Sequence, residues 1–154
     1  MHDTLIIGVG NDACGDDGAG LAVARALKDR VGPGVRVAEL GLDAFGLIDL
    51  LRVARSLIVV DAAQSGAEPG TIHRFDARSA PLPAGVFRCA STHALGITSA
   101  IELGRALDLL PAEITVFGIE GQSFARRTRL SPAVEAATQV TIERIAAELH
   151  AESI

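Results

Sequence analysis

The chain alternates between short runs of β-branched residues and longer stretches with helical periodicity, and this alternation constrains the fold more than any other feature. The short runs lie at residues 5–7, 35–38, 57–60, 71–75 and 114–117. The first and third runs are continuously apolar, which is typical of strands covered on both faces. The run at 71–75 alternates between apolar and polar residues and is more typical of an edge strand.

Stretches with apolar residues at helical spacing separate these runs. They span residues 18–31, 44–55 and 93–110, and a fourth begins at Ser131-Pro132, where serine suits the N-cap and proline the first helical position. A strand–helix–strand succession of this kind predicts a doubly wound parallel sheet. We therefore expect residues 1–154 to form a single α/β domain, a three-layer α/β/α sandwich whose mostly parallel, twisted sheet has about five strands.

Composition narrows the classes of partner. The 154 residues carry a formal net charge of −5, whereas a chain that binds nucleic acid as its main partner needs a basic surface. No apolar segment reaches the ~18 residues that cross a bilayer, and the N-terminus lacks the pattern of a secretory signal. Cys14 and Cys89 form no CxxC pattern. We expect a cytoplasmic monomer with reduced thiols and with neither a membrane nor a nucleic-acid partner.

Carboxylates gather where the predicted strands end. In open α/β sheets, ligands bind beyond the carboxyl ends of the strands. The residues that follow the first, second, third and fifth runs include Asn11, Asp16, Asp17, Gly41, Asp43, Asp61, Glu120 and Gln122. Because like charges repel at short range, several carboxylates at one edge favour a site that holds a cation.

The loop at residues 8–20, GVGNDACGDDGAG, has five glycines and three aspartates and permits two interpretations. Residues 8–13 match the GxGxxA form of the dinucleotide fingerprint, and Glu39 follows the second run, where a ribose-binding acid belongs. That fingerprint requires a helix that begins at once and faces the pyrophosphate, but helical periodicity begins only near Gly18. The aspartates would also repel a pyrophosphate. A nucleotide-binding, Rossmann-like module that is not a protease is the alternative to a metal site.

The metal interpretation combines Asp17 and Asp61, which lie at the ends of neighbouring strands if the first and third strands are adjacent. Among the four histidines, His93 is predicted at a helix N-terminus near the same edge. Two carboxylates and one imidazole suit a divalent ion such as Ni, Zn, Mn or Fe. The same residues also fit structural roles, with Asp16 and Asp17 as a helix cap, Asp61 as a polar strand end and His93 as a capping or core histidine.

Four motifs along the chain form a set. The sequence contains GVGN at 8–11 with DDGAG at 16–20, VVDAA at 59–63 with EPGT at 68–71, TH at 92–93, and GIE at 118–120 with LSP at 130–132. In this order and at these distances, the set resembles the motifs of the hydrogenase maturation endopeptidases, including their GxGN…D(D/E)GxG opening and their GIEP…LSP segment. The resemblance covers about residues 4–140.

The resemblance implies an enzyme of the aspartic-type endopeptidase class. Members of this family cut a short C-terminal extension from the precursor of the large subunit of nickel–iron hydrogenases, after nickel has been inserted. The resemblance implies that Asp17, Asp61 and His93 are the catalytic and metal-contacting residues, and that they recognise nickel carried by the substrate. It leaves open whether a divalent metal also resides in the free enzyme. The implied partner is the large-subunit precursor.

The chain departs from the family pattern at three places. Ala13 replaces a leucine, Leu42 replaces part of a Gly-Thr pair after Gly41, and Gly121 replaces the proline of GIEP. These departures bear on which hydrogenase is the substrate. Asp43, near the second of them, fits either a specificity region or the N-cap of a helix that begins at Ala44.

The chemistry favoured by these residues is metal-assisted peptide hydrolysis. Neither Cys14 nor Cys89 has a recognisable catalytic partner, so a divalent ion that polarises the carbonyl or activates water is preferred over a protein nucleophile. Asp16, Asp17 or Asp61 would then accept the proton. Separately, Arg126, Arg127 and Arg129 form the one basic cluster in an acidic chain, either as a solvated loop or as a docking site for an acidic patch.

Overall fold

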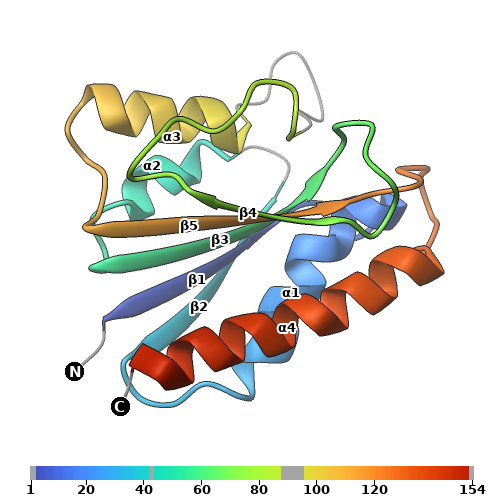
Figure 1. The fold of residues 1–154 in the computed structure, drawn as a ribbon, viewed down its shortest axis with the longest axis horizontal. Helices are drawn as coiled ribbons and strands as arrows, with labels where there is room; N and C mark the ends of the chain where they lie inside the picture. Colours follow the sequence, from blue (N-terminus) through green and yellow to red (C-terminus); the bar gives the residue numbers. More distant parts are fainter. Residues whose placement is uncertain (1–2, 42–43, 88–95, 153–154) are drawn as a thin grey trace.

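A five-stranded sheet forms the middle layer of the computed structural model, which describes residues 3–41, 44–87 and 96–152 (Figure 1). Its spatial order is β2-β1-β3-β5-β4, and the strands are β1 (Thr4–Val9), β2 (Val35–Leu40), β3 (Ser56–Ala63), β4 (Ile72–Asp76) and β5 (Glu113–Glu120). β1, β2, β3 and β5 are parallel, and β4 pairs with β5 in the antiparallel sense at the edge. The five predicted strands and the predicted edge position are therefore confirmed.

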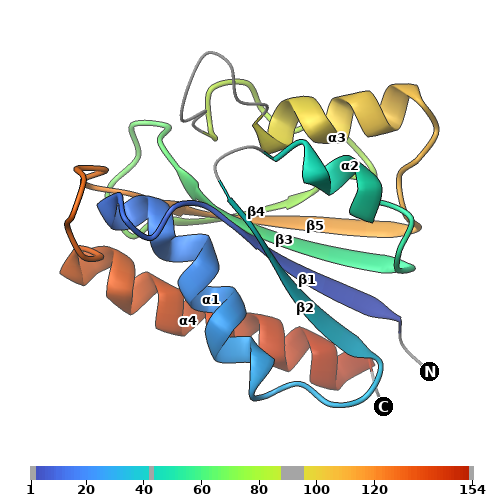
Figure 2. The ribbon, with the colours of Figure 1, turned by 180° about the vertical axis from the view of Figure 1, so that it is seen from behind.

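Helices cover both faces of this sheet (Figures 1 and 2). α1 (Ala19–Lys28) and α4 (Pro132–Glu152) lie on one face, and α2 (Gly46–Leu50) and α3 (Ile97–Ala106) lie on the other. The predicted three-layer α/β/α sandwich is confirmed. Within the ranges that the structure describes, no helix combines the length and the apolar character that crossing a membrane requires.

The two central strands owe their position to side chains that are apolar on both faces. In β3, Leu57 and Val59 join the cluster under α2 and α3, whereas Ile58 and Val60 join the cluster under α1 and α4. β1 divides its side chains in the same way. Because successive side chains of a strand point to opposite faces, a continuously apolar run is stable only between two covering layers.

The described helices differ from the predicted ones mainly at their ends. α3 stops at Ala106 because Asp108 adopts a left-handed conformation with φ of 57°. The amides of Asp108 and Leu109 then donate hydrogen bonds back to carbonyl oxygens in the last turn of the helix. α2 covers only the middle of the predicted stretch 44–55. α3 begins at Ile97 with Gly96 as N-cap, and the predicted start at His93 lies outside the described residues.

Candidate functional site

Asp61 lies near the carboxyl end of β3, inside the strand rather than directly after it as predicted, because pairing with β5 continues to Ala63. Its side chain is 5% exposed, and by strand alternation it faces the α2–α3 layer, as Val59 does. In register, Asp61 pairs with Gly118 of β5, and Gly118 pairs on its other side with His73 of β4. Asp61 and His73 therefore lie on either side of Gly118, which has no side chain.

The opening loop returns to the end of β1 and brings Asp17 to the same edge. Gly10 has φ of 149°, and a Cβ there would lie 2.0 Å from the carbonyl oxygen of Asp17, which also accepts a hydrogen bond of 3.1 Å from the Asn11 amide. A Cβ on Gly20 would lie 2.2 Å from the carbonyl oxygen of Val60. Glycine alone permits backbones to approach this closely. The first turn of α1 thus rests directly on β3.

Asp17 therefore lies beside the strand that carries Asp61. It belongs to the short 3-10 helix η1 (Gly15–Gly18), which packs against β3, and its side chain is 5% exposed. β1 and β3 are adjacent, which the predicted placement of Asp17 beside Asp61 requires. A buried carboxylate requires hydrogen bonds, protonation or a cation to compensate its lost hydration. Asp17 and Asp61 thus lie at the same edge of the sheet, where the Ala62 amide donates a hydrogen bond of 2.8 Å to Oδ1 of Asp61.

His93, the third predicted ligand, and Cys89 lie outside the described residues. Among the residues that are described, no three His, Cys, Asp or Glu side chains are grouped to hold a metal ion. α3 covers the face of the sheet toward which Asp61 points, and its N-terminus lies at the carboxyl edge, since its other end leads to the start of β5 (Figure 2). The ligand set as a whole stays a prediction.

Asp16 has a structural role that the sequence did not reveal. The side chain is fully buried, and its carboxylate accepts four hydrogen bonds from the segment that follows β5. Oδ2 accepts bonds from the amides of Gln122 (2.7 Å) and Ser123 (3.0 Å) and from the Ser131 hydroxyl (2.9 Å), and Oδ1 accepts one from the Ser131 amide (2.7 Å). Asp16 thereby ties the opening loop to the start of α4.

A second polar cluster, which sequence reasoning missed, surrounds Glu120 at the end of β5. Its carboxylate, 2% exposed, accepts bonds from the Ser65 amide (2.8 Å) and hydroxyl (2.5 Å) and lies 3.1 Å from His73 Nε2. Burial is the largest single influence and raises the pKa of Glu120, but the bonds from Ser65 and His73 together outweigh it and hold that pKa below its ordinary value. The signal in the sequence was a histidine inside an otherwise alternating strand.

The nucleotide interpretation does not fit the geometry. No α-helix follows residues 8–13 directly, because the four-residue 3-10 helix η1 intervenes and α1 begins only at Ala19. The carboxylate of Glu39, the expected ribose ligand, accepts bonds of 3.0 and 2.8 Å from Arg25, which also binds Asp12 at 2.8 Å. The loop therefore does not offer a pyrophosphate the helix N-terminus that it needs, and the carboxylate of Glu39 is already paired with Arg25.

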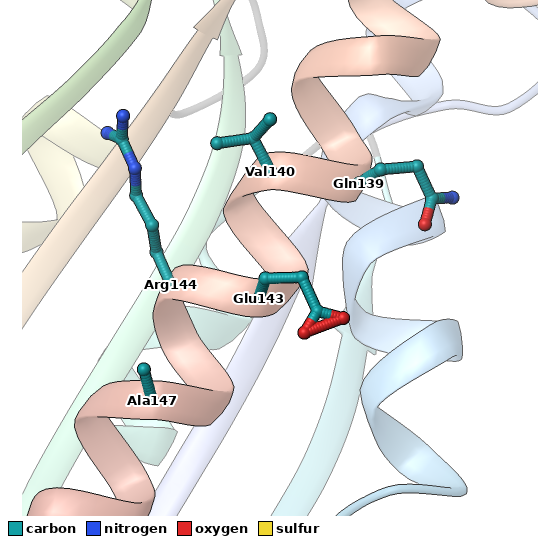
Figure 3. Close-up of a pocket in the computed structure, with 5 residues that line it drawn as sticks. All are labelled: Gln139, Val140, Glu143, Arg144 and Ala147. Carbon is teal, nitrogen blue, oxygen red and sulfur yellow. The ribbon is translucent and has the colours of Figure 1, made fainter.

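A surface hollow of about 440 Å³ lies elsewhere, on the outer side of α4 (Figure 3). It is lined by Gln139, Val140, Glu143, Arg144 and Ala147, which come from one helix on the face opposite Asp61. These five residues include neither a pair of metal-ligating carboxylate, imidazole or thiol side chains nor a nucleophile beside a base. We therefore place the candidate site at the carboxyl edge.

Comparisons with known proteins show which family the chain resembles. Residues 21–148 match the sequence profile of the family described as hydrogenase maturation protease. The hydrogenase expression/formation protein HupD of Thiocapsa roseopersicina is 27% identical over 148 residues, which cover 89% of this chain and 66% of HupD. The chain thus spans about two thirds of the length of that relative.

Solved structures show the same similarity. The hydrogenase maturating endopeptidase HybD of E. coli superposes with a TM-score of 0.82 at 26% identity, covering 99% of this chain and 94% of HybD. The [NiFe] hydrogenase maturation protease HybD of Thermococcus kodakarensis superposes with a TM-score of 0.74 at 31% identity, covering 97% of this chain and 99% of that protein.

Proposed function

Because this chain belongs to the hydrogenase maturation protease family, we propose that it removes the C-terminal extension from the precursor of a nickel–iron hydrogenase large subunit. The observation that supports the proposal is that two buried residues, Asp17 and Asp61, lie at the carboxyl edge of adjacent parallel strands. This is the edge at which open α/β sheets bind their ligands.

Recognition of the substrate's nickel is the finer part of the proposal. Asp17 and Asp61 supply carboxylate oxygens, and His93 is proposed to supply an imidazole nitrogen, a donor set that suits a divalent ion of this kind. The fold itself compensates part of the hydration that Asp61 loses, because the Ala62 amide donates a hydrogen bond of 2.8 Å to its Oδ1. The charge of the carboxylate oxygens favours a positively charged ligand over a neutral one. A precursor without nickel would lack this contact and would bind less well.

The hydrolysis then requires little from the protein beyond positioning and one proton acceptor. Nickel at this point supplies a Lewis acid for the scissile carbonyl. A water molecule attacks the carbonyl carbon, its proton passes to Asp17 or Asp61, and the same proton leaves on the amine when the peptide bond breaks. Asp16 is left out of this sequence because its four hydrogen bonds hold the loop.

The test is incubation of the purified protein with nickel-loaded and nickel-free large-subunit precursor, with cleavage followed by mass spectrometry. We expect cleavage of the nickel-loaded form only, and a loss of about a hundredfold or more in rate for Asp17→Asn and for Asp61→Asn. Asp12→Asn is the matched control, because Asp12 lies in the same loop but 59% of its side chain is exposed. Equal cleavage of both precursors, or unchanged rates in both site variants, would contradict the proposal.

A further inference from the structure

The segment that follows β5 carries an exposed group of positive charges beside the candidate site. We call residues 122–131 the basic loop, since Arg126, Arg127 and Arg129 lie within it and all three are exposed. The loop begins at the carboxyl edge, directly after Glu120 and Gly121, and ends where α4 begins (Figure 1). Its charge contrasts with a chain whose net charge is −5.

The basic loop is held in a defined conformation. The Arg127 amide donates a bond of 2.7 Å to the carbonyl oxygen of Ala13, and the Thr128 hydroxyl donates one of 2.6 Å to the carbonyl oxygen of Ala125. Asp16 fixes both ends of the loop through its four bonds. Arg127 adopts φ of 60°, a conformation that side-chain-bearing residues adopt only where the surroundings impose it. A loop fixed in this way loses little conformational entropy on binding.

The charges of the basic loop are available to a partner. Other arginines are engaged within the fold, such as Arg25 with Asp12 and Glu39 and Arg30 with Glu143. By contrast, no ion pair or hydrogen bond joins the three loop guanidinium groups to any residue in the described part of the chain. Two carboxylates of the opening loop are already engaged elsewhere, because Asp12 binds Arg25 and Asp16 is buried.

We propose that Arg126, Arg127 and Arg129 dock an acidic segment of the protein substrate and so guide its scissile peptide to the edge that carries Asp17 and Asp61. This inference rests on the proposed function, which makes the partner a protein precursor. Guanidinium groups pair with carboxylates through two parallel hydrogen bonds, and exposed charges act mainly on the rate of association. The acidic net charge of the whole chain disfavours nucleic acid as the occupant.

The experiment compares two triple variants with the unchanged chain. One replaces Arg126, Arg127 and Arg129 by Gln. The matched control replaces Lys28, Arg52 and Arg55 by Gln, which removes the same charge from exposed positions at the opposite edge of the sheet. Circular dichroism confirms that both variants are folded. Binding is measured with the nickel-loaded precursor and with a fluorescein-labelled decaglutamate peptide, at ionic strengths from about 0.05 to 0.5 M.

We expect the loop variant to bind both probes about tenfold more weakly at low ionic strength, with the difference disappearing at high salt. Its single-turnover cleavage rate at saturating precursor should stay unchanged, and the control variant should change either quantity by less than about twofold. Equal losses in both variants, a salt-independent loss, or tighter loop-dependent binding of a single-stranded DNA of equal charge would overturn the proposal. Salt-dependent, loop-dependent binding without any cleavage would uphold docking and reject the proposed function instead.

Discussion

Replacing Asp16 by alanine should destabilise the fold strongly, although Asp16 is not assigned a catalytic role. The change removes the acceptor for three backbone amides and one hydroxyl, all held by a fully buried carboxylate. A hydrogen bond to a charged group contributes about 1.5–3 kcal/mol, but the four are not additive, because the exposed side of the basic loop can recover water. We therefore expect a loss of about 3–5 kcal/mol.

Thermal and urea unfolding measure this loss directly. For a domain of this size, about 3–5 kcal/mol corresponds to a fall in Tm of about 10 °C. Asp12→Ala is the matched control, because it removes a carboxylate from the same loop but breaks only an exposed ion pair with Arg25, worth about 0–1 kcal/mol.

A second measurement distinguishes a loosened loop from general destabilisation. The basic loop contains three arginines, so limited trypsin digestion at a temperature where both variants are folded should cut Asp16→Ala within it and spare Asp12→Ala. If Asp16→Ala unfolds within about 1 kcal/mol of Asp12→Ala, and the loop resists trypsin equally in both, the structural role assigned to Asp16 is wrong.

Three further predictions follow from particular contacts. Gly20→Ala should lower the free energy of unfolding, measured by urea titration, by about 3 kcal/mol or more, because its Cβ would lie 2.2 Å from the Val60 carbonyl oxygen. Gly32→Ala is the control and should be nearly neutral, because a Cβ there would meet nothing within 4 Å. Glu120→Gln should destabilise at pH 7 but progressively less as the pH falls below about 4. A carboxyl whose folded pKa is lowered contributes its full stability above its unfolded pKa and loses it as the pH falls through the folded one. Gly121→Pro, which restores the family's proline, should lower Tm, because its amide loses a bond of 3.0 Å to the end of β3 and its Cβ would lie 2.5 Å from the Phe124 ring.

The sequence predicted the layers of this fold because its strongest signals are local. Continuous apolar runs specify doubly covered strands, and Ser131-Pro132 specifies a helix start, since each depends on neighbouring residues only. Helix ends were less predictable. α3 ends where Asp108 turns into the left-handed region and redirects two amides, and an aspartate at that position has no distinctive pattern around it.

The placement of two candidate residues at the carboxyl edge was predictable, because topology alone determines it. Asp17 and Asp61 lie at one edge because the ends of parallel neighbouring strands meet there, a rule that needs only the strand order. The Glu120 cluster was not predictable in this way. His73 reaches Glu120 only because β4 runs antiparallel to β5 in one particular register, and the alternation at 71–75 indicated an edge strand without its direction.

The three aspartates of the opening loop show why a motif cannot be treated as one functional unit. Asp12 is exposed and pairs with Arg25, so its contribution is a surface ion pair of small magnitude. Asp16 and Asp17 are neighbours in sequence and both buried, but the carboxylate of Asp16 binds the basic loop, whereas η1 holds Asp17 against the strand of Asp61. Asp16 and Asp17 thus have different roles: Asp16 fixes the basic loop, and Asp17 is proposed to contact the substrate's metal. The glycines make this separation possible, because they let the loop backbone pass within contact distance of β1 and β3.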